Sequence, residues 1–166
     1  MRKLIVTVAI CVGAAGLVWA QGAAANKTDT QWKCSAPNPV NMIPVGDAPD
    51  HAYVIDQVKC VASKGEIAGV KDKDGMGTEF AEATGNNSKG HGIFVETLAN
   101  GDKVTYTYTF TGVSKDNKMV SGTNSFKQSN GTGKFKGMTG SGTCKAKGNP
   151  DGSSTFDCTG TYVMGK

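Results

Sequence analysis

The sequence predicts an all-β protein, a single antiparallel up-and-down (meander) β-barrel of about eight strands that is stapled by disulfides. Three observations carry this prediction. Short β-prone runs recur at spacings of roughly ten residues, with turn residues between them. No stretch of the chain after residue 20 has a sustained helical pattern of apolar residues. Glycine is 23 of 166 residues, and several glycines lie inside the β-prone runs, where they relieve crowding at the bends of a barrel.

The clearest element is the run 103–111, in which apolar or aromatic residues alternate with threonines. A period of two places one set of side chains on one face of a strand. The sequence Asn100-Gly101-Asp102 before it predicts a tight hairpin turn. The other expected strands span 51–62, 78–84, 92–98, 119–128, 142–147 and 154–161. The glycines within these runs that favour a barrel over a sandwich are Gly122, Gly140, Gly142 and Gly160.

Residues 1–20 have the pattern of a cleaved secretory signal peptide. A short basic segment precedes an apolar stretch from Leu4 to Val18, and Ala20 ends a suitable cleavage motif. Cleavage a few residues later is a close alternative, whereas a lipoprotein at Cys11 or an uncleaved anchor fits the pattern less well. We therefore expect an exported protein, periplasmic or secreted, with no membrane span once the signal is removed.

The next segment, 21–50, is expected to lie outside the barrel. Residues 21–31 are polar and alanine-rich, which is typical of a flexible arm. Four of the five prolines then fall between Lys33 and Asp50, so this part should be extended or looping. The barrel domain is expected at 51–166.

Removal of the signal peptide also removes Arg2, the only arginine in the chain. The remaining basic side chains are 16 lysines against 14 acids, so the formal net charge falls from +4 to +2. A chain without a guanidinium group has no planar fork for phosphate or carboxylate. We expect no nucleic-acid partner and no cofactor.

Four cysteines remain after the signal is removed, an even number that is typical of disulfides in an exported chain. Gly148-Asn149-Pro150-Asp151-Gly152 predicts a turn, and Cys144 and Cys158 are each seven residues from Asp151. Facing positions of a hairpin can meet disulfide distances, so we expect Cys144–Cys158 and, by elimination, Cys34–Cys60. A zinc site is disfavoured because no CxxC spacing is present, and no metal site is expected.

Residues suited to chemistry are few. Glu82 alternates with Phe80 and Thr84 and is a candidate acid or base at the mouth or interior of the barrel. His91 is a second catalytic candidate. For each we favour the structural alternative, a solvent-facing side chain.

Three further patterns have a functional and a structural interpretation. The stripe Tyr106, Tyr108 and Phe110 is a candidate lining for a small ligand cavity, and a filled core is the simpler alternative. The neighbours Asp47, Asp50 and His51 and the sequence Asp72-Lys73-Asp74-Gly75 are interpreted as a strand entry and a turn, not as metal ligands.

The segment 130–143, NGTGKFKGMTGSGT, resembles the GTGxFxGxxGxGT segment of the allene oxide cyclase-like barrels, a superfamily that also contains the dirigent proteins. More broadly, 34–162 resembles small exported bacterial proteins through His51-Ala52-Tyr53, Glu66-Ile67-Ala68-Gly69, Asn100-Gly101-Asp102-Lys103 and Gly142-Thr143-Cys144-Lys145. The resemblance implies a barrel in which a compact turn with an aromatic residue precedes a glycine-bearing strand, and a bacterial source.

Three classes of function stay open on the sequence. The first is non-enzymatic binding of a small apolar or amphipathic ligand, or of another macromolecule. The second is a cyclase-like or isomerase-like enzyme that acts on a reactive small molecule in the barrel pocket. The third is a structural or interaction protein of the cell envelope. A cavity with a buried carboxyl group beside a tyrosine favours the enzyme, an apolar cavity favours binding, and a filled barrel favours the interaction protein.

Overall fold

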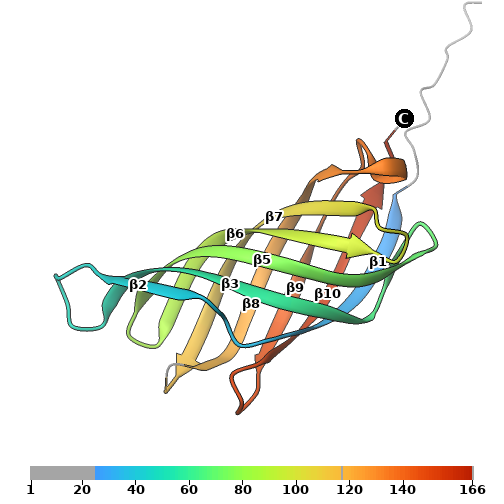
Figure 1. The fold of residues 1–166 in the computed structure, drawn as a ribbon. Coiled ribbons are helices and arrows are strands. Elements are labelled where there is room, and N and C mark those ends of the chain that lie inside the picture. Colours follow the sequence, from blue (N-terminus) through green and yellow to red (C-terminus); the bar gives the residue numbers. More distant parts are fainter. Residues whose placement is uncertain (1–24, 117, 166) are drawn as a thin grey trace, which may run out of the picture.

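Eight antiparallel strands close into a barrel in the computed structural model, which describes residues 25–116 and 118–165 (Figure 1). The ring runs β3-β1-β10-β9-β8-β7-β6-β5, and it closes where β5 pairs with β3. Two short strands, β2 and β4, pair only at the edges of β3 and β5. The predicted eight-stranded antiparallel barrel is therefore confirmed. Within the described residues, no helix has the length and apolar character that a membrane span needs.

The ten strands follow the chain with short connections. Their bounds are β1 Asn26–Cys34, β2 Val40–Pro44, β3 His51–Lys64, β4 Glu66–Ile67, β5 Val70–Thr84, β6 Asn87–Leu98, β7 Lys103–Lys115, β8 Lys118–Gly131, β9 Thr139–Gly148 and β10 Ser154–Val163. A single 3₁₀ turn, η1, spans Gly133–Phe135 between β8 and β9.

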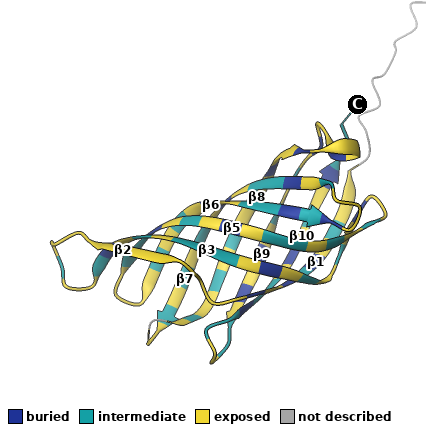
Figure 2. Cartoon of the chain, viewed as in Figure 1, coloured by how far each residue is buried: buried dark blue, intermediate teal, exposed yellow. Residues whose placement is uncertain are grey.

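Side chains alternate between the barrel interior and its outer surface along every strand of the ring, which gives the bands of buried and exposed residues in Figure 2. On β7 the interior positions are Val104, Tyr106, Tyr108 and Phe110, and the threonines between them face outward. The period of two in the sequence therefore corresponds to a strand with one face inside the barrel.

The N-terminal segment corrects the expected domain boundary. Residues 21–31 are expected in a flexible arm and residues from Lys33 in a looping segment, but Asn26–Cys34 form β1. This strand pairs with β10 over its whole length and with β3 at its C-terminal end. Without β1 the ring would be open, and the barrel thus begins at Asn26 and not at His51. The proline-rich residues that follow form β2 on the edge of β3. The expected signal peptide, 1–20, lies outside the described residues.

Both expected disulfides are present. Cys144 lies opposite Cys158 on neighbouring strands, and Cys34 lies opposite Cys60, with Cα–Cα distances of 4.0 Å in each pair. All four cysteines are buried on the interior face, where they pack with Trp32. Two disulfides indicate folding in an oxidising, non-cytoplasmic environment.

One end of the barrel is filled by an apolar cluster that includes η1. Phe135 is 0% exposed and packs there with five other buried side chains, Ile67, Leu98, Val104, Met138 and Tyr162. The turn with Phe135 directly precedes the glycine-bearing strand β9, as the family resemblance implies. This cluster closes the interior on one side and leaves a separate group of side chains in the middle of the barrel.

Candidate functional site

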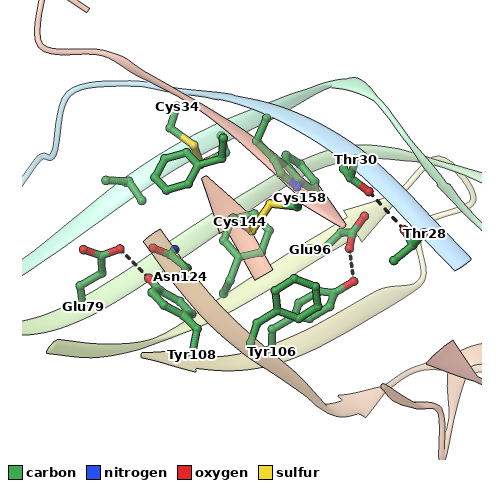
Figure 3. A pocket seen from close by; sticks show the side chains of 16 residues that line it. Thr28, Thr30, Cys34, Glu79, Glu96, Tyr106, Tyr108, Asn124, Cys144 and Cys158 are labelled. Carbon is green, nitrogen blue, oxygen red and sulfur yellow. Dashed lines mark hydrogen bonds between the residues drawn. A yellow bond between two sulfur atoms is a disulfide. The ribbon is translucent and has the colours of Figure 1, made fainter. Parts of the chain in front are cut away.

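A cavity of about 90 Å³ lies inside the barrel, beside the cluster formed by Trp32 and the two disulfides (Figure 3). Its walls come from the interior faces of all eight ring strands, with Cys144 as the one contribution of β9, and six aromatic residues form much of them. The ring-bearing residues are Trp32, Phe94, Tyr106, Tyr108, Phe126 and Phe156. Two carboxyl groups, Glu79 and Glu96, also line the cavity, and none of the lining side chains is basic.

Tyr108 and Glu79 form the first polar pair in this cavity. The Tyr108 hydroxyl donates a hydrogen bond of 2.7 Å to Glu79 Oε1, although the two residues are on β7 and β5 with β6 between them. The residue of β6 between them is Gly92, where an added Cβ would lie 2.6 Å from the Tyr108 hydroxyl. Glycine at this position therefore gives the tyrosine room to reach across a strand to the glutamate.

Glu79 also faces a second carboxyl group. Asp56 on β3 is its direct cross-strand partner, and both side chains are on the interior face. Like charges at facing positions destabilise a sheet. Burial raises the pKa of Glu79 to about 7, Tyr108 opposes the rise by its hydrogen bond, and Asp56 adds to it. Burial likewise raises the pKa of Asp56, whose Oδ1 has no hydrogen-bond partner among the described residues.

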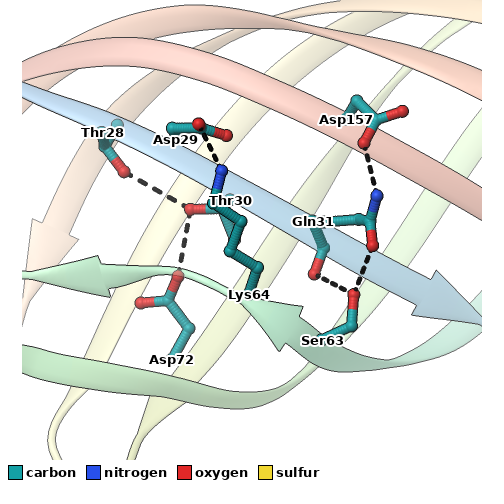
Figure 4. Close-up of polar contacts among 8 residues, drawn as sticks. All are labelled: Thr28, Asp29, Thr30, Gln31, Ser63, Lys64, Asp72 and Asp157. Carbon is teal, nitrogen blue, oxygen red and sulfur yellow. Dashed lines mark hydrogen bonds and ion pairs between the residues drawn. The ribbon is translucent and has the colours of Figure 1, made fainter.

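Tyr106 and Glu96 form the second polar pair, nearer the closed end. The Tyr106 hydroxyl donates a hydrogen bond of 2.6 Å to Glu96 Oε2, and Glu96 is only 2% exposed. Burial, and then the charge of the nearby Asp72, raise the pKa of Glu96 well above its ordinary value. Asp72 itself accepts a hydrogen bond of 3.0 Å from the Thr30 hydroxyl (Figure 4). Burial and the charge of Asp72 therefore favour the protonated form of Glu96.

The strand that carries Thr30 is fixed from its outer side as well. Lys64 Nζ lies 2.6 Å from Asp29 Oδ2, and Gln31 Nε2 donates a hydrogen bond of 2.8 Å to Asp157 Oδ1 (Figure 4). These contacts join β1 to β3 and β10, the two neighbours between which it closes the ring.

The aromatic walls of the cavity contact one another in a chain. The ring centroids of Trp32 and Phe94 are 5.1 Å apart, and those of Tyr106 and Phe126 are 5.5 Å apart, both edge to face. Phe94 lies over Gly75 of β5, where an added Cβ would be 2.2 Å from its ring. The sequence predicts that glycines within the strands relieve crowding at bends of the barrel. Here a glycine makes room for a ring from the neighbouring strand.

The two catalytic candidates from the sequence lie on the opposite side of the sheet from the cavity. Glu82 faces outward, where its carboxylate is 3.1 Å from both His51 Nε2 and Lys89 Nζ. Lys89 and then His51 lower the pKa of Glu82 through these contacts. His91 is exposed on the outer face, 5.6 Å from the ring of Phe80. Glu82 therefore does not face the interior, and the structure agrees with the favoured alternative, a solvent-facing side chain.

The group around His51 forms a polar contact network on the outer surface. His51 Nδ1 lies 2.6 Å from Asp47 Oδ1, and Asp47 and Glu82 raise the pKa of His51. In the part of the chain that the structure describes, no group of three or more His, Cys, Asp or Glu side chains is arranged to hold a metal ion.

Of the predicted lining residues, Tyr106 and Tyr108 line the cavity and Phe110 does not. Phe110 is the next interior residue along β7, with its ring 6.3 Å from that of Tyr108. Glu79 and Glu96 are the functional candidates that sequence reasoning did not single out. Glu79 alternates with Gly77 and Ala81 on one face of its strand. Such a row of small residues indicates an interior face whose space is occupied by side chains from other strands, and it was the one sign in the sequence that Glu79 is interior.

Comparison with known proteins supports the fold. The chain matches no protein-family model and no curated protein sequence. Among solved structures it is similar to the pterocarpan synthase dirigent protein GePTS1, with a TM-score of 0.52 and 10% sequence identity over 93% of this chain and 96% of that one. It is also similar to the pterocarpan synthase dirigent protein PsPTS1, with a TM-score of 0.51 and 11% identity over 86% of this chain and 97% of that one. The fold is thus that of the dirigent-like barrels, in agreement with the resemblance drawn from the glycine-rich segment.

Proposed function

We propose that this chain is an exported protein, periplasmic or secreted, that binds a small amphipathic molecule inside its barrel. The observation that carries the proposal is the pair of Tyr–Glu hydrogen bonds that face a cavity with mostly apolar walls, six of whose lining residues are aromatic. Small-molecule sites are concave, mostly apolar and supplied with a few fixed polar groups. An interaction protein with a filled barrel has no need of such an arrangement.

The size of the cavity limits what can enter it. At about 90 Å³ it is smaller than the roughly 150 Å³ apolar cavity that admits benzene. We therefore expect a head group of a few heavy atoms inside the barrel, with any longer part of the ligand extending out of it. The polar atom of that head group would lie against the hydroxyl of Tyr108 and the carboxyl group of Glu79.

Native mass spectrometry of the protein purified from its own compartment tests this proposal. A retained mass that dissociates on unfolding is the expected result. Val58 lines the cavity, so Val58→Phe places a larger side chain in the space and should abolish the retained mass. Val61→Phe is the matched control, because Val61 is on the same strand, faces outward and is 62% exposed. A mass retained equally by both variants, each with an unchanged melting temperature, would contradict binding in the cavity.

A second function, acid–base catalysis on the bound molecule, is favoured by one observation. The pKa of Glu79 is raised to about 7, and a general base works best when its pKa is near the operating pH. The dirigent proteins with the same fold are described as pterocarpan synthases. If Glu79 moves a proton, the retained compound should exchange a carbon-bound hydrogen in D₂O with the wild type and not with Glu79→Gln. Equal exchange rates would leave binding as the only function supported.

A further inference from the structure

The charges inside the barrel are all of one sign. Four carboxyl groups face the interior, as two neighbouring pairs: Asp56 with Glu79, and Asp72 with Glu96. Every lysine among the described residues is exposed on the outside of the molecule. Both histidines are on the outer face as well, His51 between Asp47 and Glu82, and His91 beside Phe80. No cationic side chain of the described residues is therefore available to the interior carboxyl groups.

The pair of Asp56 and Glu79 is unfavourable as it stands. The two residues face each other across β3 and β5, and Asp56 Oδ1 is buried without a hydrogen-bond partner. On the other side of Glu79, its partner on β6 is Gly92, which has no side chain. Among the described residues, the hydroxyl of Tyr108 on β7 is the one side-chain group that donates a hydrogen bond to Glu79. A cation from outside the chain would relieve the repulsion that the fold leaves in place.

The remaining walls suit an organic cation better than a metal ion. Six aromatic rings line the cavity, and the chain of contacts from Trp32 through Phe94 and Tyr106 to Phe126 presents rings from four different strands. Aromatic rings attract ammonium groups through their electron-rich faces, and cages of such rings recognise quaternary ammonium ligands. A metal ion needs several ligands around one point, and no group of three or more His, Cys, Asp or Glu side chains in the described part of the chain is arranged in this way.

We infer that the polar group of the ligand is a small organic cation, an amine or quaternary ammonium, held between the aromatic walls and the carboxyl group of Glu79. This inference rests on the proposed binding function. The same charges exclude ligands with a carboxylate or phosphate head group from the cavity, because none of the described residues that line it is basic. Glu79 would give up its proton when the cation enters, so binding should release a proton near neutral pH.

Calorimetric titration with choline and with its uncharged isostere, 3,3-dimethylbutan-1-ol, tests the inference. The two probes have the same shape and differ in charge, and choline does not titrate. At pH 8 choline should bind at least about tenfold more tightly than the alcohol. Its affinity should fall by about tenfold from pH 8 to pH 6, as the ionised fraction of a group with a pKa of about 7 falls. The affinity of the alcohol should stay constant over this range.

Two variants on β5 test whether the preference for choline and its pH dependence come from Glu79. Glu79→Gln should lower the affinity for choline by about tenfold at pH 8 and remove the pH dependence of that affinity. The affinity of the variant for the alcohol should stay within about twofold of the wild-type value. Glu82→Gln, on the outer face, should behave as wild type with both probes. If the alcohol binds to the wild type as tightly as choline or more tightly, the inference of a cationic ligand is wrong, and the proposed binding of a small amphipathic molecule is unaffected. If neither probe binds, the cation inference fails, and native mass spectrometry decides separately on ligand binding in the barrel.

Discussion

Replacing Glu79 by Gln should stabilise the protein at neutral and alkaline pH. In the folded chain the pKa of Glu79 is raised from 4.5 to about 7, chiefly by burial. Each pKa unit corresponds to about 1.4 kcal/mol, so ionised Glu79 costs the folded state about 3 kcal/mol. Glutamine is neutral, has nearly the same shape and can still accept the hydrogen bond of Tyr108. The variant therefore keeps the hydrogen bond from Tyr108 and avoids the free-energy cost of burying an ionised carboxylate.

The raised pKa of Glu79 determines the pH range in which the wild type loses stability. Below pH 4.5 the carboxyl group is protonated in both the folded and the unfolded chain, and the wild type has the full stability of the neutral group. Between pH 4.5 and about 7 the unfolded chain releases the proton and the folded chain does not, so wild-type stability falls. Above about pH 7 both states are ionised and the loss is constant. The difference between Glu79→Gln and wild type should follow the same course.

Urea unfolding at closely spaced pH values from 4 to 8.5 measures this difference. We expect the free energy of unfolding of the variant, relative to wild type, to rise by about 3 kcal/mol across the window and then to level off. Glu82→Gln is the matched control, because that glutamate is on the outer face and Lys89 and His51 lower its pKa. A difference between Glu79→Gln and wild type that stays flat with pH would refute the electrostatic account of the cavity.

Three further predictions concern the hydrogen bond, the disulfides and the closed end of the barrel. Tyr108→Phe removes the donor that opposes the rise in the pKa of Glu79, so a carboxyl NMR titration should give a midpoint above 7; a midpoint below that of wild type would be inconsistent with the hydrogen bond. Replacing Cys144 and Cys158 by serine should cost about 3 kcal/mol in urea unfolding, given a sequence separation of 14 residues, whereas an unchanged midpoint would show that the bridge adds nothing. Phe135→Ala should cost about 3–5 kcal/mol by the same assay, because its ring is 0% exposed; a loss under about 1 kcal/mol would mean that the end cluster does not support the barrel.

The sequence was most informative where structure depends on nearby residues. The strand β7 was predicted from its alternation alone, because every second side chain from Val104 to Phe110 faces the interior. The bridge between Cys144 and Cys158 followed from the geometry of one hairpin, and elimination then gave the other bridge. Each of these predictions needed only a local period or a turn.

The strand β1 was missed because its pairing is remote. Asn26 lies opposite Tyr162, so the partner that makes this segment a strand is at the other end of the chain. Its interior positions also begin with Thr28 and Thr30 instead of apolar residues. Over this first half of the strand both faces are polar, so no apolar period is present for sequence reasoning to detect.

The interior position considered for Glu82 failed for a different reason, which lies in the other residues of β5. On β5 the large apolar side chains Met76 and Phe80 are outside, each 39% exposed, and the interior face has glycine and alanine beside Glu79. The interior space there is taken by Tyr108 and by the ring of Phe94, which comes from the next strand. On this strand the large apolar residues are on the outer face. Glu82 shares that face with Phe80, so it lies outside although an apolar neighbour two residues away usually indicates the interior.

An ¹H–¹⁵N NMR titration with choline or with 3,3-dimethylbutan-1-ol, whichever binds more tightly, tests the central claim most directly. If the ligand lies inside the barrel at the Tyr–Glu pairs, the largest shift changes should occur at the indole N–H of Trp32 and at the amides beside Glu79 and Tyr108. Val61→Phe should leave these changes as they are, and Val58→Phe should abolish them. Shift changes confined to outward-facing residues such as His91, with Trp32 unaffected, would contradict a binding site in the barrel interior.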